Sequence, residues 1–194
     1  MLVFGTEGLE EALRSLGAVL EARGLSYRLL VAGGSSLLLL GFVDRVTADL
    51  DVVGIAEGGG YRRGEPLPVP LVAAVADVAR ALDLDPRWLN AGPASLVDFG
   101  LPEGLADRVT VRRYGGLELH LPGRVDLICF KLYAAADQGP RSKHHADLEA
   151  LDPTASELLV AARWAVTHDP SAGFRMMLTD SLRLFGVEVS DGDI

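Results

Sequence analysis

The chain opens with apolar residues that recur three or four positions apart, at Leu9, Ala12, Leu13, Leu16, Val19 and Leu20. This spacing predicts an amphipathic helix over residues 7–23, with Thr6 as its cap and Gly24 as its stop signal. A short apolar run over residues 27–32 predicts a strand. Residues 36–42 are apolar on every side and predict a buried helix, and imperfect alternation over residues 48–55 predicts a second strand.

Turn-forming residues dominate the next segment. Residues 57–70 hold three successive glycines and three prolines, which indicates a mobile, lid-like loop that is poorly ordered without a ligand. Residues 71–82 are rich in alanine and leucine and predict a helix. Asp85-Pro86 predicts the start of a short helix that holds Trp88, because aspartate suits the cap and proline the first helical position.

The pattern changes again near residue 122. Two β-prone runs, 108–113 and 117–121, flank Gly115-Gly116 and predict a hairpin. From Val125 onward the pattern is helical, and it includes a capping box formed by Thr154 and Glu157.

Strands mixed with helices, followed by helices alone, indicate an α/β (α+β) fold. We expect a small mixed sheet flanked by helices over residues 1–122, and a helical extension over residues 123–194. The extension is expected to contribute residues that complete the functional site.

Composition narrows the function classes. The net charge of -9 disfavours a general nucleic-acid binder, because phosphate neutralisation needs a basic surface. Only Lys131 and Lys143 are lysines among 18 basic residues, which hints at a role that arginine cannot fill. Cys129 is the single cysteine and is expected in the core.

No signal peptide is visible, and the longest aliphatic block, residues 37–40, is too short for a bilayer, so we expect a cytoplasmic protein without a membrane partner.

Asp49-Leu50-Asp51 is the first candidate for chemistry. Residues two apart on a strand face the same way, so both carboxylates would point together while Leu50 turns into the core. Two aligned carboxylates can hold one or two Mg²⁺ ions, whose hard charge suits oxygen ligands and triphosphates. The alternative is a strand with two ordinary surface acids.

Gly33-Gly34-Ser35 lies between a predicted strand and a predicted helix. Two glycines allow close backbone approach, the helix start offers N–H groups to an anion, and the Ser35 hydroxyl can reach a phosphate oxygen. The alternative is a tight turn with a serine cap. Because no Gly-Lys-Ser/Thr follows, this is not a Walker loop.

The order of these features, GGSSLLLLGFVDRVTADLDVV, resembles the signature of the nucleotidyltransferase superfamily, which has the DNA-polymerase-β-like fold. Residues 45–51 are similar to its Arg-x-Thr-x-Asp-hydrophobic-Asp form. The resemblance implies a catalytic metal site at Asp49 and Asp51. It also implies nucleotide and phosphate binding by Gly33, Gly34, Ser35 and Arg45.

Lys131 lies among apolar neighbours, so it is expected to be partly buried, with its ammonium reaching a polar site or a carboxylate. The alternative is a lysine that extends to water. The run RVDLICFKLYAAADQGPRSKHHADLEAL resembles the AbiEii-like branch, which includes toxins of type IV toxin–antitoxin systems. Residues 86–90 are similar to a Trp-Leu-Asn segment of uncharacterised bacterial members. The resemblance implies catalytic roles for Lys131 and Asp147; the alternative for Asp147 is pairing with Arg141 or Lys143.

A third carboxylate is harder to place. Glu118 is the candidate, although strand alternation puts it equally well on a solvent face. His144 and His145 do not predict a zinc site, since adjacent histidines on a helix point apart and no cysteine cluster supports them.

Together these features predict a Mg²⁺-dependent enzyme that moves a nucleoside monophosphate from a nucleoside triphosphate to an acceptor hydroxyl. The acceptor is RNA, a protein or a small molecule, and the resemblance allows an antitoxin protein as partner. The same fold can instead serve as a non-catalytic binding or antitoxin-partner module. In the enzyme, Lys131→Met is expected to fold as well as the parent while losing transfer.

Overall fold

The computed structural model describes residues 4–139, 141–190 and 192–194. The chain divides into two compact units. Unit 1 takes in the residues up to Gly100 together with Ala106–Pro122, and unit 2 takes in Leu101–Leu105 and Gly123–Ile194. The division expected from the sequence, 1–122 and 123–194, differs from this one in the segment 101–105.

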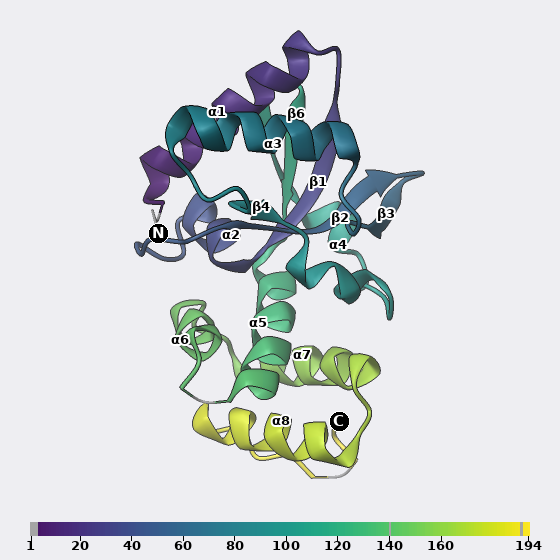
Figure 1. Ribbon diagram of the computed structural model, residues 1–194. Coiled ribbons are helices and arrows are strands. Elements are labelled where there is room, and N and C mark those ends of the chain that lie inside the picture. The colour runs from purple at the N-terminus through teal and green to yellow at the C-terminus, as the bar shows by residue number, and fades with distance from the viewer. Residues whose placement is uncertain (1–3, 140, 191) are drawn as a thin grey trace. The chain divides into compact units, whose positions relative to one another are not determined.

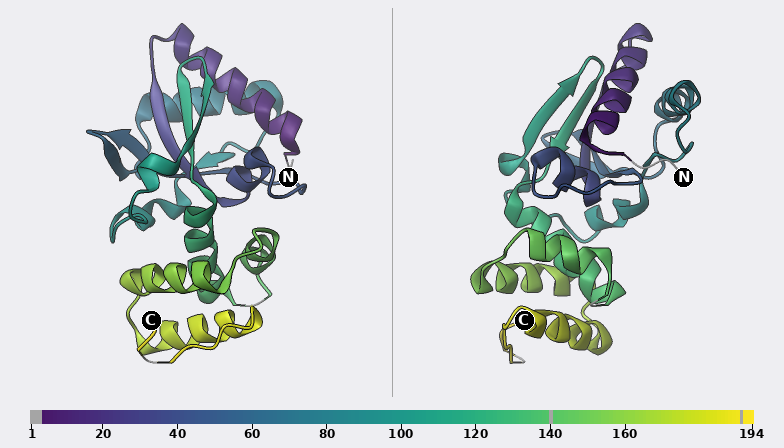
Figure 2. Two further views of the ribbon diagram at one scale, coloured as in Figure 1. Left: turned by 180° about the vertical axis from the view of Figure 1, so that it is seen from behind. Right: turned by 90° about the vertical axis from the view of Figure 1, so that its left-hand side faces the viewer.

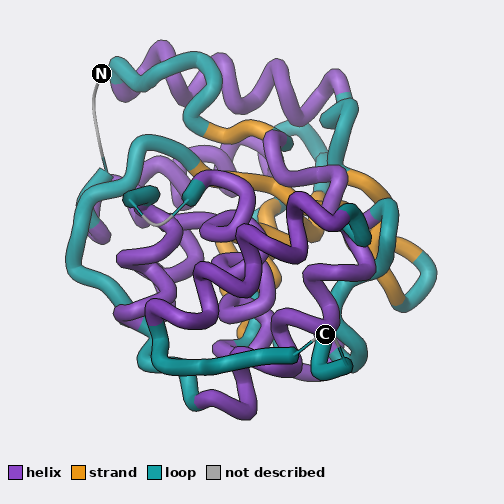
Figure 3. Tube along the Cα trace, turned by 90° about the horizontal axis from the view of Figure 1, so that it is seen from below, coloured by secondary structure: helices purple, strands orange, loops and turns teal. Residues whose placement is uncertain are grey.

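Unit 1 is built on one mixed sheet of six strands, in the order β3-β2-β1-β6-β5 with β4 beside β2 (Figure 1). The strands are β1 (Tyr27–Ala32), β2 (Leu50–Glu57), β3 (Gly60–Arg63), β4 (Leu89–Asn90), β5 (Thr110–Tyr114) and β6 (Leu117–Leu121). The β1–β6 and β2–β4 pairs are parallel, and the other pairs are antiparallel. The predicted mixed sheet is therefore confirmed, and all six strands, orange in Figure 3, belong to unit 1.

Two helices cover one face of this sheet, α1 (Thr6–Ala22) and α3 (Val69–Leu82) (Figures 1 and 2). Their apolar positions meet alternate residues of the central strands in one core, which includes Leu13, Leu16, Leu71, Val75, Leu29, Val31, Leu50 and Leu119. Side chains alternate between faces along a strand. The residues next to these core positions, among them Ala32, Asp51 and Glu118, consequently lie on the opposite face.

Local signals placed several elements correctly. The first strand is β1 as predicted, and the β5–β6 hairpin forms around Gly115, whose positive φ of 53° suits glycine. The first helix begins at Thr6, but its cap is Gly5 and no side chain bonds to the helix start. Thr6 as a capping residue was thus wrong.

Two segments of unit 1 differ from expectation. Residues 57–70 are not an irregular lid: Gly58 and Gly59 turn the chain, and β3 pairs antiparallel with β2, before α3 begins at Val69. The prediction of a loop was wrong because three successive glycines are typical of loops as well as of the tight turn in a hairpin. Asp85 and Pro86 start a turn rather than a helix, because the chain extends again at β4 to pair with β2.

Unit 1 also holds α2 (Gly33–Leu40) and the short 3₁₀ helix η1 (Gly92–Val97), and α4 (Leu105–Arg108) lies where the chain passes between the units. Helix α2 begins at Gly33, so the Gly-Gly-Ser segment forms its first turn instead of a loop before it.

Unit 2 is helical, with α5 (Arg124–Gln138), α6 (Lys143–Ala150), α7 (Ala155–His168) and α8 (Ala172–Leu184). The capping box at the start of α7 is confirmed: the Thr154 hydroxyl accepts from the Glu157 N–H, and the Glu157 carboxylate accepts from the Thr154 N–H. Cys129 is buried in α5 as expected. Throughout the described residues, no helix has both the length and the apolar character needed to cross a membrane.

Candidate functional site

Asp51 is the second residue of β2 in unit 1, and Asp49 directly precedes the strand, which begins at Leu50 rather than at residue 48 as predicted. Leu50 between them is fully buried in the core, while both aspartates are partly exposed, and strand alternation puts Asp51 on the face opposite α1 and α3. Asp51 is held in register from both sides, opposite Ala32 of β1 and Asn90 of β4. The Leu50 N–H also donates to the Trp88 carbonyl at 2.6 Å. The acidic pair is therefore placed by three adjacent strands.

The first turn of α2 lies directly against this pair. Strand β1 runs into the helix without a loop, and Gly33 turns the chain with a positive φ of 81°. A Cβ added to Gly33 would overlap the Oδ2 atom of Asp51. Glycine is thus required at 33 by both its backbone conformation and the carboxylate that lies over it.

Ser35 has a different local role from the predicted one. Its side chain is fully buried and its hydroxyl donates to the Ala32 carbonyl at 3.2 Å. The group that Ser35 can offer an anion is consequently its backbone N–H, since the first N–H groups of a helix have no acceptor within it. Ser36 is also fully buried, and its hydroxyl has no hydrogen-bond partner among the described residues.

Arg45 brings a positive charge to the same turn. A Cβ added to Gly34 would lie 3.0 Å from Arg45 Nη2 and 3.2 Å from Thr47 Oγ1. Thr47 is buried and anchored by two backbone hydrogen bonds with Phe4, at 2.6 and 2.9 Å. Its hydroxyl donates to the Asp49 carbonyl at 3.3 Å. The segment that carries Arg45 is therefore anchored at Thr47, and the Arg45 guanidinium lies beside the first turn of α2.

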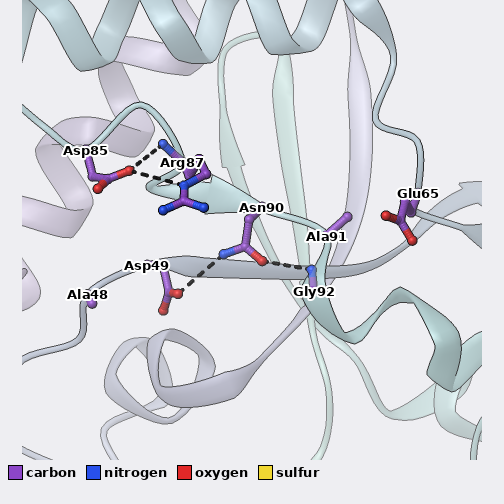
Figure 4. Close-up of a pocket in the computed structure, with 8 residues that line it drawn as sticks. All are labelled: Ala48, Asp49, Glu65, Asp85, Arg87, Asn90, Ala91 and Gly92. Atoms are coloured by element: carbon purple, nitrogen blue, oxygen red, sulfur yellow. Dashed lines mark hydrogen bonds and ion pairs between the residues drawn. The ribbon is translucent and has the colours of Figure 1, made fainter.

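A pocket with a volume of about 520 Å³ opens beside Asp49 (Figure 4). Its lining residues are Ala48, Asp49, Glu65, Asp85, Arg87, Asn90, Ala91 and Gly92. Asn90 occupies the centre of this view: its Oδ1 accepts from the Gly92 N–H at 2.8 Å, and its Nδ2 donates to Asp49 Oδ2 at 3.4 Å. The side chain thus links the acidic pair to the pocket wall.

The carboxylate oxygens of Asp49 and Asp51 suit a hard divalent cation such as Mg²⁺. In the described part of the chain, no three His, Cys, Asp or Glu residues gather into a cluster that could hold a metal ion by themselves. Mg²⁺ is commonly bound by one or two carboxylates, with water and substrate phosphates as its remaining ligands. Asp49 and Asp51, next to an anion-binding helix start, fit that pattern, and they would hold the ion together with a phosphate ligand.

Glu118, the candidate third acid, lies away from the pair. It is level with Arg28 on β1, whereas Asp51 is level with Ala32, four residues further on. At roughly 3.3 Å per residue, this separates the two positions by about 13 Å along the strand. Continuing the β6 register would place Pro122, which has no carboxylate, level with Asp51.

Glu118 instead belongs to a chain of polar contacts across the sheet. Its Oε1 lies 2.8 Å from His120 Nε2, and its Oε2 accepts from Arg113 at 2.8 Å. His120 Nδ1 lies in turn 2.7 Å from the Tyr61 hydroxyl. The hydrogen bond with His120, supported by Arg113, lowers the pKa of Glu118. Burial raises the pKa of Tyr61 to about 12.

In unit 2, Lys131 and Asp147 form a buried ion pair. Lys131 Nζ lies 2.7 Å from Asp147 Oδ2, and the side chains are 3% and 1% exposed. The expectation that the ammonium reaches a carboxylate is confirmed, and the alternative of a lysine extended to water is wrong. Lys131 of α5 and Asp147 of α6, to which the resemblance gives separate roles, are therefore in contact, and the carboxylate pairs with Lys131.

His144 and His145 stand close to this pair in the sequence. His145 lies near Phe185, with ring centroids 4.9 Å apart, and its Nδ1 is 3.6 Å from Glu149. Among the residues that the structure describes, neither histidine belongs to a group of three or more His, Cys, Asp or Glu side chains.

The sequence patterns predicted no functional role for Asn90 or Tyr61. The Asn-x-Gly spacing at residues 90–92 is a local signal for the turn in which Asn90 accepts from the Gly92 N–H. No local signal joins Asn90 to Asp49, because that contact depends on the parallel pairing of β4 with β2.

Comparisons with protein-family models, with curated proteins and with solved structures found no match to this chain.

Proposed function

We propose that unit 1 binds a nucleoside triphosphate with Mg²⁺ and transfers its nucleotidyl group to an acceptor hydroxyl. The observation that carries this proposal is the contact between Gly33 and the Asp51 carboxylate. It brings one of the two proposed metal-binding acids against a helix start whose N–H groups can face an anion, an arrangement that suits a metal–triphosphate complex. The signature-like order of these residues in the sequence supports a nucleotidyltransferase fold.

The residues of unit 1 have distinct roles in the proposal. The N–H groups of Gly34 and Ser35 and the guanidinium of Arg45 bind the triphosphate. Asp49 and Asp51 provide carboxylate oxygens for Mg²⁺. When bound, this ion neutralises phosphate charge and stabilises the charge that develops as pyrophosphate leaves. Roles for Lys131 and Asp147 rest on the resemblance, and variants of unit 2 test them separately.

The test begins with binding. Thermal unfolding with Mg²⁺ and each of the four ribonucleoside triphosphates should show a rise in Tm that needs both components. The double variant Asp49→Asn, Asp51→Asn should keep its fold, since both side chains are partly exposed, and should lose that rise. An unchanged rise in this variant would contradict the site assignment.

Transfer is tested next. The protein is incubated with each α-labelled triphosphate and with RNA, protein and small-molecule fractions of a cell extract, using the double asparagine variant as control. Label that enters one fraction only with the parent protein identifies the acceptor class.

A nucleotide-binding module without transfer is the second candidate. It is favoured because, among the described residues, no third acid joins Asp49 and Asp51 in a metal-binding group, and Glu118 lies about 13 Å away along the sheet. Mg²⁺-dependent triphosphate binding without label transfer to any fraction would support the module and contradict the enzyme.

A further inference from the structure

Asn90 is fixed by two hydrogen bonds of different character. The Gly92 N–H can only donate, so the atom that faces it at 2.8 Å is the amide oxygen of Asn90. The amide nitrogen then points the other way and donates to Asp49 Oδ2 at 3.4 Å. The turn at residues 90–92 therefore decides which end of the amide meets the carboxylate (Figure 4).

This arrangement makes the two oxygens of Asp49 unequal. Oδ2 accepts a hydrogen bond from Asn90, which restrains rotation of the carboxylate. Asn90 donates to Oδ2 and not to Oδ1, so Oδ1 stays available to a metal ion. The hydrogen bond therefore favours Oδ1 as the metal ligand. Residues that orient a ligating carboxylate in this way commonly change metal affinity when they are removed.

Strand pairing also places Asn90 next to the second aspartate of the pair. Asn90 on β4 is level with Asp51 on β2, so it flanks both members of the acidic pair. An amide at this position restrains Asp49 without adding negative charge. An aspartate there would place a third carboxylate beside the pair, where repulsion is costly unless a cation is bound.

We propose that Asn90 is a positioning residue for the metal site, which orients Asp49 and presents its Oδ1 to the ion. This inference rests on the proposed function, because it assumes that Asp49 and Asp51 hold a divalent cation together with a nucleotide. It assigns Asn90 no contact with the reacting atoms.

The test measures Mn²⁺ binding by electron paramagnetic resonance, in the presence of the non-hydrolysable α,β-methylene analogue of the preferred triphosphate. Asn90→Ala should raise the Kd for Mn²⁺ roughly 10- to 100-fold. Asn90→Asp should act in the opposite direction, with tighter Mn²⁺ binding but a lower Tm in the absence of metal. A residue that only stabilises the turn would lower Tm in Asn90→Ala and leave the Kd of that variant for Mn²⁺ unchanged, whereas Asn90→Asp would keep the turn, since a carboxylate can also accept from the Gly92 N–H.

Asp85→Ala is the matched control. Asp85 lines the same pocket and makes a similar turn bond, since its Oδ1 accepts from the Arg87 N–H at 2.8 Å, but this bond does not involve Asp49. Its Kd for Mn²⁺ should stay that of the parent protein.

The outcomes separate the two proposals. Parental Mn²⁺ affinity in Asn90→Ala, with binding lost in Asp49→Asn, would overturn the role of Asn90 and leave the proposed function standing. Absence of Mn²⁺ binding by the parent protein with every triphosphate analogue would overturn both.

Discussion

Gly33 and Asp51 are in direct contact, although they are 18 positions apart in the chain: a side chain at 33 would occupy the space that the Asp51 carboxylate fills. The contact joins the first turn of α2 to the start of β2. It means that the glycine serves two purposes, since it turns the chain between β1 and α2 and makes room for an acid at the helix N-terminus.

This relationship predicts that Gly33→Ala abolishes the Tm rise caused by Mg²⁺ and a triphosphate. The added methyl group would displace Asp51, and the alanine would also be strained at a φ of 81°. Gly41→Ala is the control, because Gly41 ends the same helix with a φ of 78° and no atom lies within 4 Å of an added Cβ.

Both alanine variants should lose about 1–2 kcal/mol of stability from backbone strain. Only Gly33→Ala should lose ligand binding. An equal loss of binding in both variants would show that general destabilisation, and not the position of Asp51, was the cause.

The Lys131–Asp147 pair predicts a large effect on stability. Lys131→Met would leave the Asp147 carboxylate buried without this partner, at a cost of about 3–5 kcal/mol measured by chemical denaturation. The sequence alone predicted that methionine would be tolerated, and the buried pair reverses that expectation.

A double variant separates stability from catalysis in unit 2. Lys131→Met with Asp147→Leu replaces the pair by apolar side chains of similar size, so most of the lost stability should return. If the pair is catalytic, as the resemblance implies, this folded variant should transfer no label. Transfer at the parental rate would make the pair purely structural.

Glu118 should make stability depend on pH in the acidic range. Its pKa in the folded protein is lowered, chiefly by the hydrogen bond with His120, so its contribution is present above the ordinary glutamate value of 4.5 and is lost as pH falls. Glu118→Gln should lower the free energy of unfolding by about 0.2–1 kcal/mol at neutral pH. Urea denaturation across the acidic range should show the two proteins converging at low pH. A constant difference would contradict the assignment.

The Tyr61 hydroxyl should lose its proton at a higher pH than an ordinary tyrosine does. Burial raises its pKa from 10.0 to about 12. The stability linked to the neutral phenol is therefore present below pH 10.0 and is lost as pH rises toward about 12. The tyrosinate absorbance of the parent minus that of Tyr61→Phe isolates this group from Tyr114 and Tyr133, whose pKa values are also raised. A difference curve centred at an ordinary tyrosine pKa would show that Tyr61 is not buried in solution.

Local patterns were sufficient for much of the fold. The capping box at Thr154 and Glu157 needs only three residues of separation, and the hairpin around Gly115 needs two adjacent strands. The burial of Leu50 beside a partly exposed Asp51 follows from the two-residue repeat of a strand. Glycine-rich segments were harder, because the same residues suit a loop and the tight turn that joins β2 to β3.

By itself the sequence determined which residues are candidates for chemistry and which way the residues of a strand or helix face, since periodicity is a property of neighbouring residues. Only the tertiary structure decided which of them meet. Strand register put Asn90 beside Asp49 and set Glu118 four residues away from Asp51, while packing of α6 on α5 joined Asp147 to Lys131. Such contacts link positions far apart in the chain, and they depend on how the whole core closes rather than on any local pattern.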